Sequence, residues 1–79
     1  MSLNKVMLIG HLGQNVELKH AKSGIAVANV SVATNRKHKG EDVTEWHKVT
    51  LFKELAENAA KYLTKGSHVY VEGYLQTRS

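Results

Sequence analysis

Apolar and polar residues alternate along most of the chain, a pattern typical of β-strands because successive strand side chains point to opposite faces. The alternation predicts four strands, which lie at residues 4–12 with a continuation over 15–20 after a bend, 25–34, 43–52 and 67–77. Between the last two strands, apolar residues recur at helical spacing as far as Gly66, which is typical of a residue just past a helix end. This segment predicts a helix over residues 53–64.

The order of three strands, one helix and a final strand predicts an all-β fold. A small curled sheet or barrel accommodates this order better than alternating strand and helix layers. A chain of 79 residues is enough for one small domain, so we expect residues 1–79 to form a single unit. Both faces of the first strand are apolar, which indicates burial on two sides or a subunit interface. The polar segment 35–42 predicts a loop.

The third predicted strand has two unlike faces. One is mostly apolar, is expected to face the interior, and consists of His47, Val49 and Leu51. The other carries the only tryptophan and the only phenylalanine of the chain with a cation between them, and consists of Trp46, Lys48, Thr50 and Phe52. A core strand would not place Lys48 between two aromatic side chains, and a purely solvated face would not expose both aromatics.

This aromatic–basic face suits single-stranded nucleic acid. Trp46 and Phe52 are about 20 Å apart along an extended strand, which leaves room for more than one unpaired base. A base stacked on an aromatic side chain gains about 1–3 kcal/mol whatever its identity, and Lys48 can contact a backbone phosphate. Three cations of the preceding loop are expected to close over the bound strand, and they are Arg36, Lys37 and Lys39.

Two simpler interpretations of the same residues stay open. Trp46 and Phe52 can be core or interface residues, with Lys48 extending its charged end into solvent. The cations of the loop can serve solubility alone, because polar loop tips are often rich in lysine. The pattern of residues does not by itself decide between these interpretations and a binding face.

Composition narrows the function classes further. The formal net charge of +4 favours an anionic partner, chiefly nucleic acid or membrane. The chain has no cysteine, and its five histidines lack metal-ligand spacing, so we expect no metal or cofactor. It has no nucleophile elbow or phosphate loop, so we do not expect an enzyme. The apolar run at residues 6–9 is too short for a signal peptide or membrane span, which predicts a soluble, cytoplasmic protein without membrane contact.

Four consecutive blocks resemble bacterial-type single-stranded DNA-binding protein, and they read NKVMLIGHLGQNVEL, GIAVANVSVAT, TEWHKVTLFKELAE and YLTKGSHVYVEGYLQTR. They stand in the same order with matching gaps, and the resemblance covers residues 4–78. It implies an OB-fold, a five-stranded Greek-key barrel with one helix between the third and fourth strands. It also implies a homotetramer, a dimer of dimers, that coats single-stranded DNA in replication, recombination and repair at the bacterial nucleoid, without catalysis.

The resemblance assigns roles to individual residues. Trp46 and Phe52 match the family's stacking aromatics, and Lys48 matches a basic backbone contact between them. His38 stands where the family has a stacking tryptophan, so we expect a weaker stacking site there. The resemblance also assigns nucleic-acid contacts to Lys5, Lys65 and Arg78. The loop adds Arg36 and Lys37, which are expected contacts because of their charge and position and not because of the resemblance. Subunit contacts are implied for the first strand and one residue of the third, namely Asn4, Val6, Leu8 and His47.

The sequence departs from the family pattern at two further places. Glu54 stands where a lysine is common, which removes a cation from the start of the helix. The sequence stops at Ser79, before the family's fifth strand, a further stacking tryptophan and an acidic tail that recruits replication and repair proteins. We therefore expect a barrel without its fifth strand. An alternative function is an OB-fold replication accessory protein that mainly docks partner proteins; an RNA-binding cold-shock domain and a hydrolase fit the residues less well.

Overall fold

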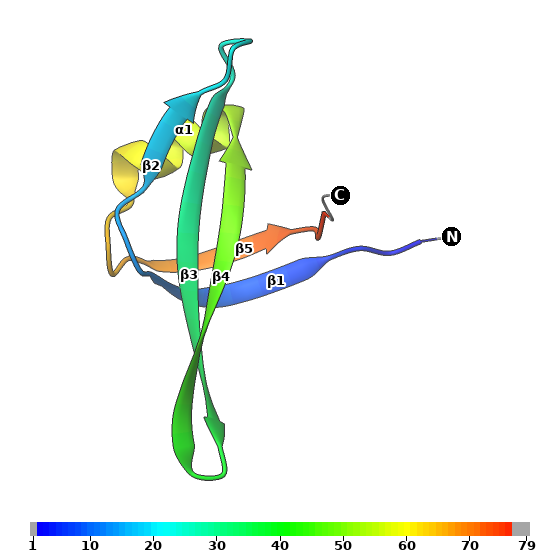
Figure 1. The fold of residues 1–79 in the computed structure, drawn as a ribbon, viewed down its shortest axis with the longest axis vertical. Coiled ribbons are helices and arrows are strands. Elements are labelled where there is room, and N and C mark those ends of the chain that lie inside the picture. Colours follow the sequence, from blue (N-terminus) through cyan, green and yellow to red (C-terminus); the bar gives the residue numbers. More distant parts are fainter. Residues whose placement is uncertain (1, 77–79) are drawn as a thin grey trace.

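The computed structural model describes residues 2–76, which form five strands and one helix (Figure 1). The elements are β1 (Val6–Leu12), β2 (Glu17–His20), β3 (Ala26–His38), β4 (Glu41–Phe52), α1 (Lys53–Tyr62) and β5 (His68–Gly73). The predicted first strand is divided into β1 and β2. Gly13 bonds to Ser31 of β3 and Glu17 pairs with Asn29, so residues 14–16 bulge out and bend the chain.

β3 organises the sheet. One of its edges pairs with β4 along the whole strand, and the other pairs first with β2 and then with the end of β1 at Ala33 and Val32. β1 then turns away and pairs with β5 from Val6 to His11. As a result β1 and β5 run across the direction of β3 and β4 (Figure 1). All of these pairs are antiparallel, and because β1 passes from β3 to β5 the sheet curls upon itself in the way that a barrel requires.

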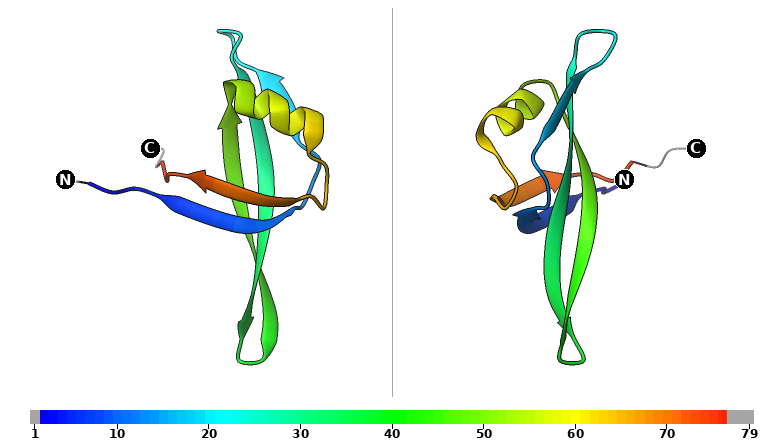
Figure 2. Two further views of the ribbon diagram at one scale, coloured as in Figure 1. Left: turned by 180° about the vertical axis from the view of Figure 1, so that it is seen from behind. Right: turned by 60° about the vertical axis from the view of Figure 1, so that its left-hand side comes forward.

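The core is thin and built from small side chains. Alternate residues of β3 are buried, and they are Ala26, Ala28, Val30 and Val32. α1 lies across this face of the sheet and buries Ala56 and Ala59 against it (Figure 2). Leu12 at the end of β1 completes the interior. Buried and more exposed residues alternate along β3 from Ala26 to Ala33, as expected of a strand with one face in the core.

The arrangement confirms the predicted OB-fold class. The helix stands between β4 and β5, which are the third and fourth strands of the predicted order, and the sheet is antiparallel and open. Within residues 2–76 no strand joins the outer edges of β4 and β5. A groove of about 1470 Å³ opens between them. Apolar side chains of four elements line it, among them Val6, Leu8, Leu51, Leu55 and Val71.

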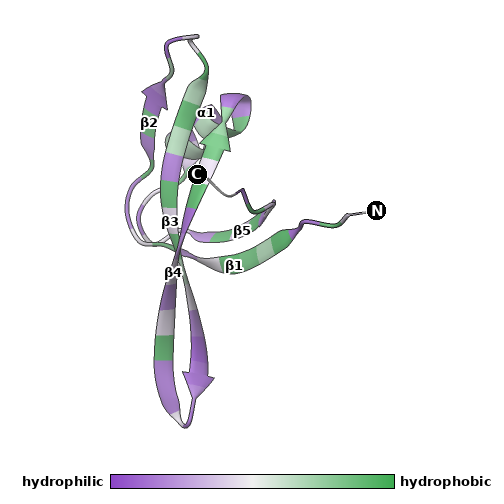
Figure 3. Ribbon diagram, turned by 45° about the vertical axis from the view of Figure 1, so that its right-hand side comes forward, coloured by the Kyte–Doolittle hydropathy of each residue, from purple (hydrophilic) through white to green (hydrophobic). Residues whose placement is uncertain are grey.

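The loop predicted over residues 35–42 is wrong. β3 and β4 continue as a paired ribbon to His38 and Glu41, and only Lys39 and Gly40 form the turn, with φ angles of 51° and 82°. Positive φ at both positions is what a two-residue hairpin turn requires. The segment is polar because the ribbon projects from the body and is hydrophilic over its outer end (Figures 1 and 3). Polarity was therefore a sign of a solvated hairpin rather than of an irregular loop.

Three smaller expectations also need correction. α1 ends at Tyr62, two residues before the predicted end. β5 ends at Gly73, and Leu75, which the alternation places on its core face, is 70% exposed. Met7 and Ile9 on the outer face of β1 are exposed, so this strand is not buried on both sides within one chain. Its subunit-interface alternative stays a prediction.

Candidate nucleic-acid interface

The two faces of β4 separate as the alternation predicts. Trp46 is 62% exposed and Phe52 is 50% exposed, with Lys48 exposed between them. His47, Val49 and Leu51 are half-buried on the other side. Trp46 and Phe52 are therefore not core residues of this chain, and their aromatic rings are open to a ligand.

β3 supplies the second half of this surface. Its outer-face residues lie directly opposite those of β4, with Ala33 paired with Trp46, Ser31 with Lys48 and Asn29 with Thr50. We call the face that the two strands share the β3–β4 platform. It consists of seven residues, and they are Asn29, Ser31, Ala33, Trp46, Lys48, Thr50 and Phe52. Small and short polar side chains between the aromatics leave space above the sheet for bases.

The centre of the platform is polar and hollowed. A hollow lies at this position, and its lining includes Asn29, Ser31 and Lys48. Gln14 of the bulged segment and Glu17 at the start of β2 also line it. The hydroxyl of Thr50 donates a 3.1 Å hydrogen bond to Oδ1 of Asn29, which fixes that amide. No role was predicted from the sequence for these polar residues of β3. Polar residues alternate with buried ones in β3, but only the pairing of β3 with β4 shows that they lie beside Lys48 and Thr50.

The indole of Trp46 reaches beyond its own strand. A Cβ atom placed on Gly13 would lie 2.2 Å from Cζ3 of Trp46, so the six-membered ring lies directly against the Gly13 backbone. Gly13 follows β1, on the far side of β3 from Trp46. The side chain therefore lies across β3, and β1 and β3 fix one end of the platform.

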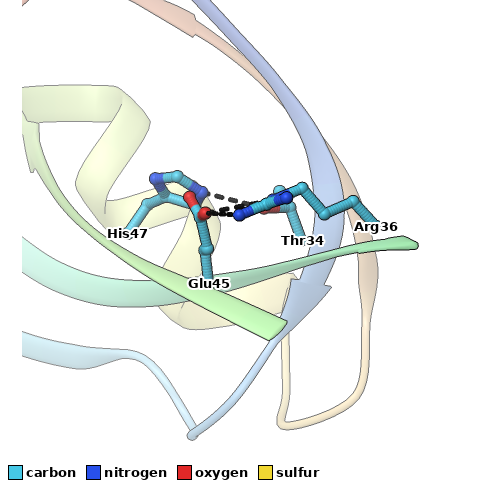
Figure 4. Close-up of polar contacts among 4 residues, drawn as sticks. All are labelled: Thr34, Arg36, Glu45 and His47. Carbon is cyan, nitrogen blue, oxygen red and sulfur yellow. Dashed lines mark hydrogen bonds and ion pairs between the residues drawn. The ribbon is translucent and has the colours of Figure 1, made fainter. Parts of the chain in front are cut away.

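The β3–β4 hairpin carries two of the predicted basic contacts, Arg36 and Lys37, and the predicted stacking residue His38. Arg36 donates from both Nε and Nη2 to Oε1 of Glu45 at 3.2 Å, beside the 2.9 Å hydrogen bond shared by Thr34 and His47 (Figure 4). Lys37 pairs with Asp42 at 3.3 Å. These ion pairs are exposed, so each contributes little to stability and can be exchanged for a phosphate.

Strand alternation divides these cations between the two sides of the hairpin. Lys37 has the parity of Ala33 and therefore lies on the Trp46 side of the ribbon. Arg36 and His38 have the parity of Thr34 and lie on the His47 side. Of the predicted hairpin contacts, only Lys37 thus extends the platform directly. His38 is exposed at the end of β3, opposite Glu41.

The other basic residues differ in their distance from the platform. The backbone N–H of Lys65 donates to Oδ1 of Asn15 at 2.8 Å, which holds the turn after α1 beside the bulge that follows Gly13. Lys65 therefore lies at the Trp46 end. Lys5 lies beyond the opposite end of β1 and pairs with Glu72. Arg78 is outside the described residues.

Glu72 also accepts a hydrogen bond from Tyr70 at 3.2 Å. Partial desolvation raises the pKa of the Tyr70 phenol, and the neighbouring Glu72 carboxylate raises it further through its charge and this hydrogen bond. Lys5, Glu72 and Tyr70 form a paired polar group on the outer face of β1 and β5. Tyr70 and Glu72 line the groove together with Trp46, Lys48 and Phe52, whereas Lys5, which precedes β1, pairs with Glu72 and does not line the groove.

The residues predicted for subunit contacts also fall into separate groups. The side-chain amide of Asn4 exchanges two hydrogen bonds with the backbone of Leu75, at 2.7 and 3.0 Å. Val6 and Leu8 are half-buried and line the groove. His47 bonds to Thr34 on the hairpin. Within residues 2–76, the edge of β1 opposite β5 makes no strand pair between Val6 and Gly10.

Residues 2–76 contain neither a candidate metal site nor a candidate membrane-spanning helix. No group of three or more histidine, cysteine, aspartate or glutamate side chains in this range is placed to hold a metal ion. No helix in the same range is long and apolar enough to cross a membrane.

The chain matches a known family over nearly its whole length. The model of the single-strand binding protein family matches residues 3–79. This match agrees with the open antiparallel sheet, its one helix between β4 and β5, and the exposed aromatic residues of β4. Membership supports single-stranded DNA binding in general. On the extent of the match and the fold together, the chain belongs to the single-strand binding protein family.

Proposed function

We propose that this chain binds single-stranded DNA without sequence preference, by stacking bases on Trp46 and Phe52 and holding phosphates with nearby cations. The observation that carries the proposal is the exposure of the only tryptophan and the only phenylalanine on one face of β4, with Lys48 between them. Stacking on an aromatic ring accepts any base, because every base has a π-face. We therefore propose that the platform contributes binding affinity but does not distinguish one base from another.

The cations divide the work of binding the backbone. Within residues 2–76 Lys48 makes no ion pair, so its charge is available to a phosphate without breaking a contact. Lys37 and Lys65 extend the positive surface from the Trp46 end, Arg36 serves a strand that wraps around the hairpin, and His38 offers that strand a weaker stacking site. Lys5 and Arg78 are the remaining contacts proposed. The net charge of +4 supports this electrostatic contribution.

We further propose that residues 1–79 act as one binding domain within a homo-oligomer, a dimer of dimers. The unpaired edge of β1 supports this, because exposed strand edges readily pair with another chain. Asn4, Val6 and Leu8 lie on or beside that strand, and we propose His47 as a second contact. Such an assembly would bring several platforms together on one strand of DNA.

Family membership supports a proposal for the biological setting. We propose a role in covering single strands during DNA replication, recombination and repair, in the cytoplasm at the bacterial nucleoid, together with replication and repair proteins. The chain is proposed to act without catalysis and without a cofactor. The alternative, an accessory protein that mainly docks other proteins, would use the same exposed Trp46 for a protein partner.

Fluorescence anisotropy with labelled oligonucleotides tests the proposal. Thymine, cytosine and mixed-sequence single strands of equal length should bind with similar affinity, and a duplex of the same length should bind much more weakly. Raising the salt concentration should weaken binding to all three single strands, because the counterions displaced from the phosphates gain less entropy when the salt concentration is already high. Equal affinity for duplex and single strand, or no binding in low salt, would overturn the proposal and favour the docking alternative.

A further inference from the structure

The contact between Trp46 and Gly13 joins the platform to a residue outside it. Cζ3, Cη2 and Cε3 of the indole would lie 2.2, 2.9 and 3.2 Å from a Cβ on Gly13. Real Cβ atoms do not approach other heavy atoms as closely as the first two of these distances. The ring therefore occupies the volume that any side chain at position 13 would need.

The sheet order explains how this contact arises. Trp46 pairs with Ala33 of β3, while Gly13 bonds to Ser31 on the other edge of that strand. Two strand spacings, about 10 Å, separate β4 from the strand position of Gly13, and only a long aromatic side chain covers this distance. The indole lies over β3 and ends at the Gly13 backbone, yet 62% of Trp46 stays exposed.

We propose that Gly13 is a positioning residue for strand binding, because its missing side chain forms the seat that fixes the orientation of the Trp46 ring. This inference rests on the proposed function and adds a residue that contacts neither base nor phosphate. An exposed tryptophan that packs against nothing samples several rotamers, and it loses this conformational entropy when a base stacks on it. A ring held against Gly13 has already lost this entropy on folding, so stacking a base on it costs less free energy.

Other glycines of the chain distinguish this role from an ordinary structural one. At Gly10 a Cβ would lie 2.2 Å from the backbone oxygen of Ala33, which cannot move without separating β1 from β3. At Gly13 the obstacle is the far end of a side chain, which can rotate away while the sheet stays intact. At Gly73 a Cβ meets nothing within 4 Å, and φ lies outside the left-handed region at Gly13 and Gly73 alike.

Gly13→Ala and Gly73→Ala make a matched pair for the experiment. Circular dichroism and thermal unfolding should show that both variants fold. Because Trp46 is the only tryptophan, its emission maximum and its quenching by acrylamide report its position directly. Gly13→Ala should shift the emission to the red and increase quenching, and it should weaken binding of a thymine oligonucleotide by about 3- to 10-fold, less than losing the whole ring. Gly73→Ala should change none of these quantities.

A second pair of variants tests whether the effect of Gly13→Ala depends on the Trp46 ring. In Trp46→Ala no ring occupies the volume next to position 13, so adding Gly13→Ala should leave the affinity of that variant unchanged. An equal loss of affinity in both backgrounds would overturn the inference, as would unfolding of Gly13→Ala, because the ring would then not be the part that yields. Unchanged emission and quenching in Gly13→Ala would overturn it as well.

The two proposals fail in different ways. If the parent protein does not bind single strands, the proposed function is wrong, and the positioning role of Gly13 is wrong with it. If the parent binds and Gly13→Ala binds equally well, only the positioning role is wrong. The emission and quenching measurements need no DNA, so they establish the contact itself in either case.

Discussion

Lys48 offers the most quantitative test of the electrostatic part of the account. It lies on β4 between the two aromatics and, among residues 2–76, shares no ion pair with an acidic side chain. Replacing it by glutamine keeps much of the length of the side chain and removes the charge. A phosphate about 4 Å from an exposed ammonium group gains roughly 1 kcal/mol in water, so Lys48→Gln should weaken binding about 5-fold.

The salt dependence gives a sharper prediction than the affinity alone. Each phosphate contact on a single strand contributes about 0.7 to the slope of log K against log salt. The ratio of parent affinity to Lys48→Gln affinity should therefore be about 2.6 times larger at 50 mM than at 200 mM salt. Fluorescence anisotropy titrations at several salt concentrations measure both quantities.

Lys61→Gln is the matched control for this experiment. Lys61 lies in the last turn of α1, and α1 packs on the face of the sheet opposite the platform. The two variants lose the same charge, so a general effect of net charge would lower both slopes equally. An unchanged slope in Lys48→Gln, or an equal change in Lys61→Gln, would refute the phosphate contact at Lys48.

Three further predictions address stacking and fold. Phe52→Ala should weaken binding of a thymine oligonucleotide by about 1–3 kcal/mol in calorimetry with little change in the salt slope; a loss that appears only as a smaller slope would contradict a stacking role. Gly10→Ala should destabilise the fold by about 1–3 kcal/mol in chemical unfolding, because the added methyl meets the Ala33 backbone. Gly40→Ala should cost about 1 kcal/mol in the same assay, because φ is 82° in the hairpin turn, and should leave affinity for thymine oligonucleotides unchanged.

Short-range patterns in the sequence were enough for much of the fold and for the candidate aromatic face. Strict alternation in β4 separated Trp46 and Phe52 from His47, and the burial of these residues agrees with that separation. Alternation works there because each side chain's face depends only on its own strand. The same alternation is visible in β3, where Ala28 and Val32 are fully buried and their neighbours in the strand's outer face are not.

The parts that were not predicted depend on contacts between distant segments. The sequence predicts a loop at the hairpin end of β3 and β4 because this segment lacks the alternation of apolar and polar residues. Its cross-strand pairs are polar, as Asn35 and Thr44 show. The seat of Trp46 at Gly13 requires the order of β1, β3 and β4, which no single segment specifies. Gly13 was expected only as a bend point.

The most direct test of the account is a titration of Trp46 fluorescence with a thymine oligonucleotide, at about 50 mM and about 200 mM salt. The only tryptophan of the chain stands at one end of the β3–β4 platform, so its emission reports whether a base stacks there. The account predicts strong, saturable quenching whose midpoint moves to higher oligonucleotide concentration as salt rises. Unchanged emission at both salt concentrations, with the fold verified by circular dichroism, would contradict stacking on Trp46.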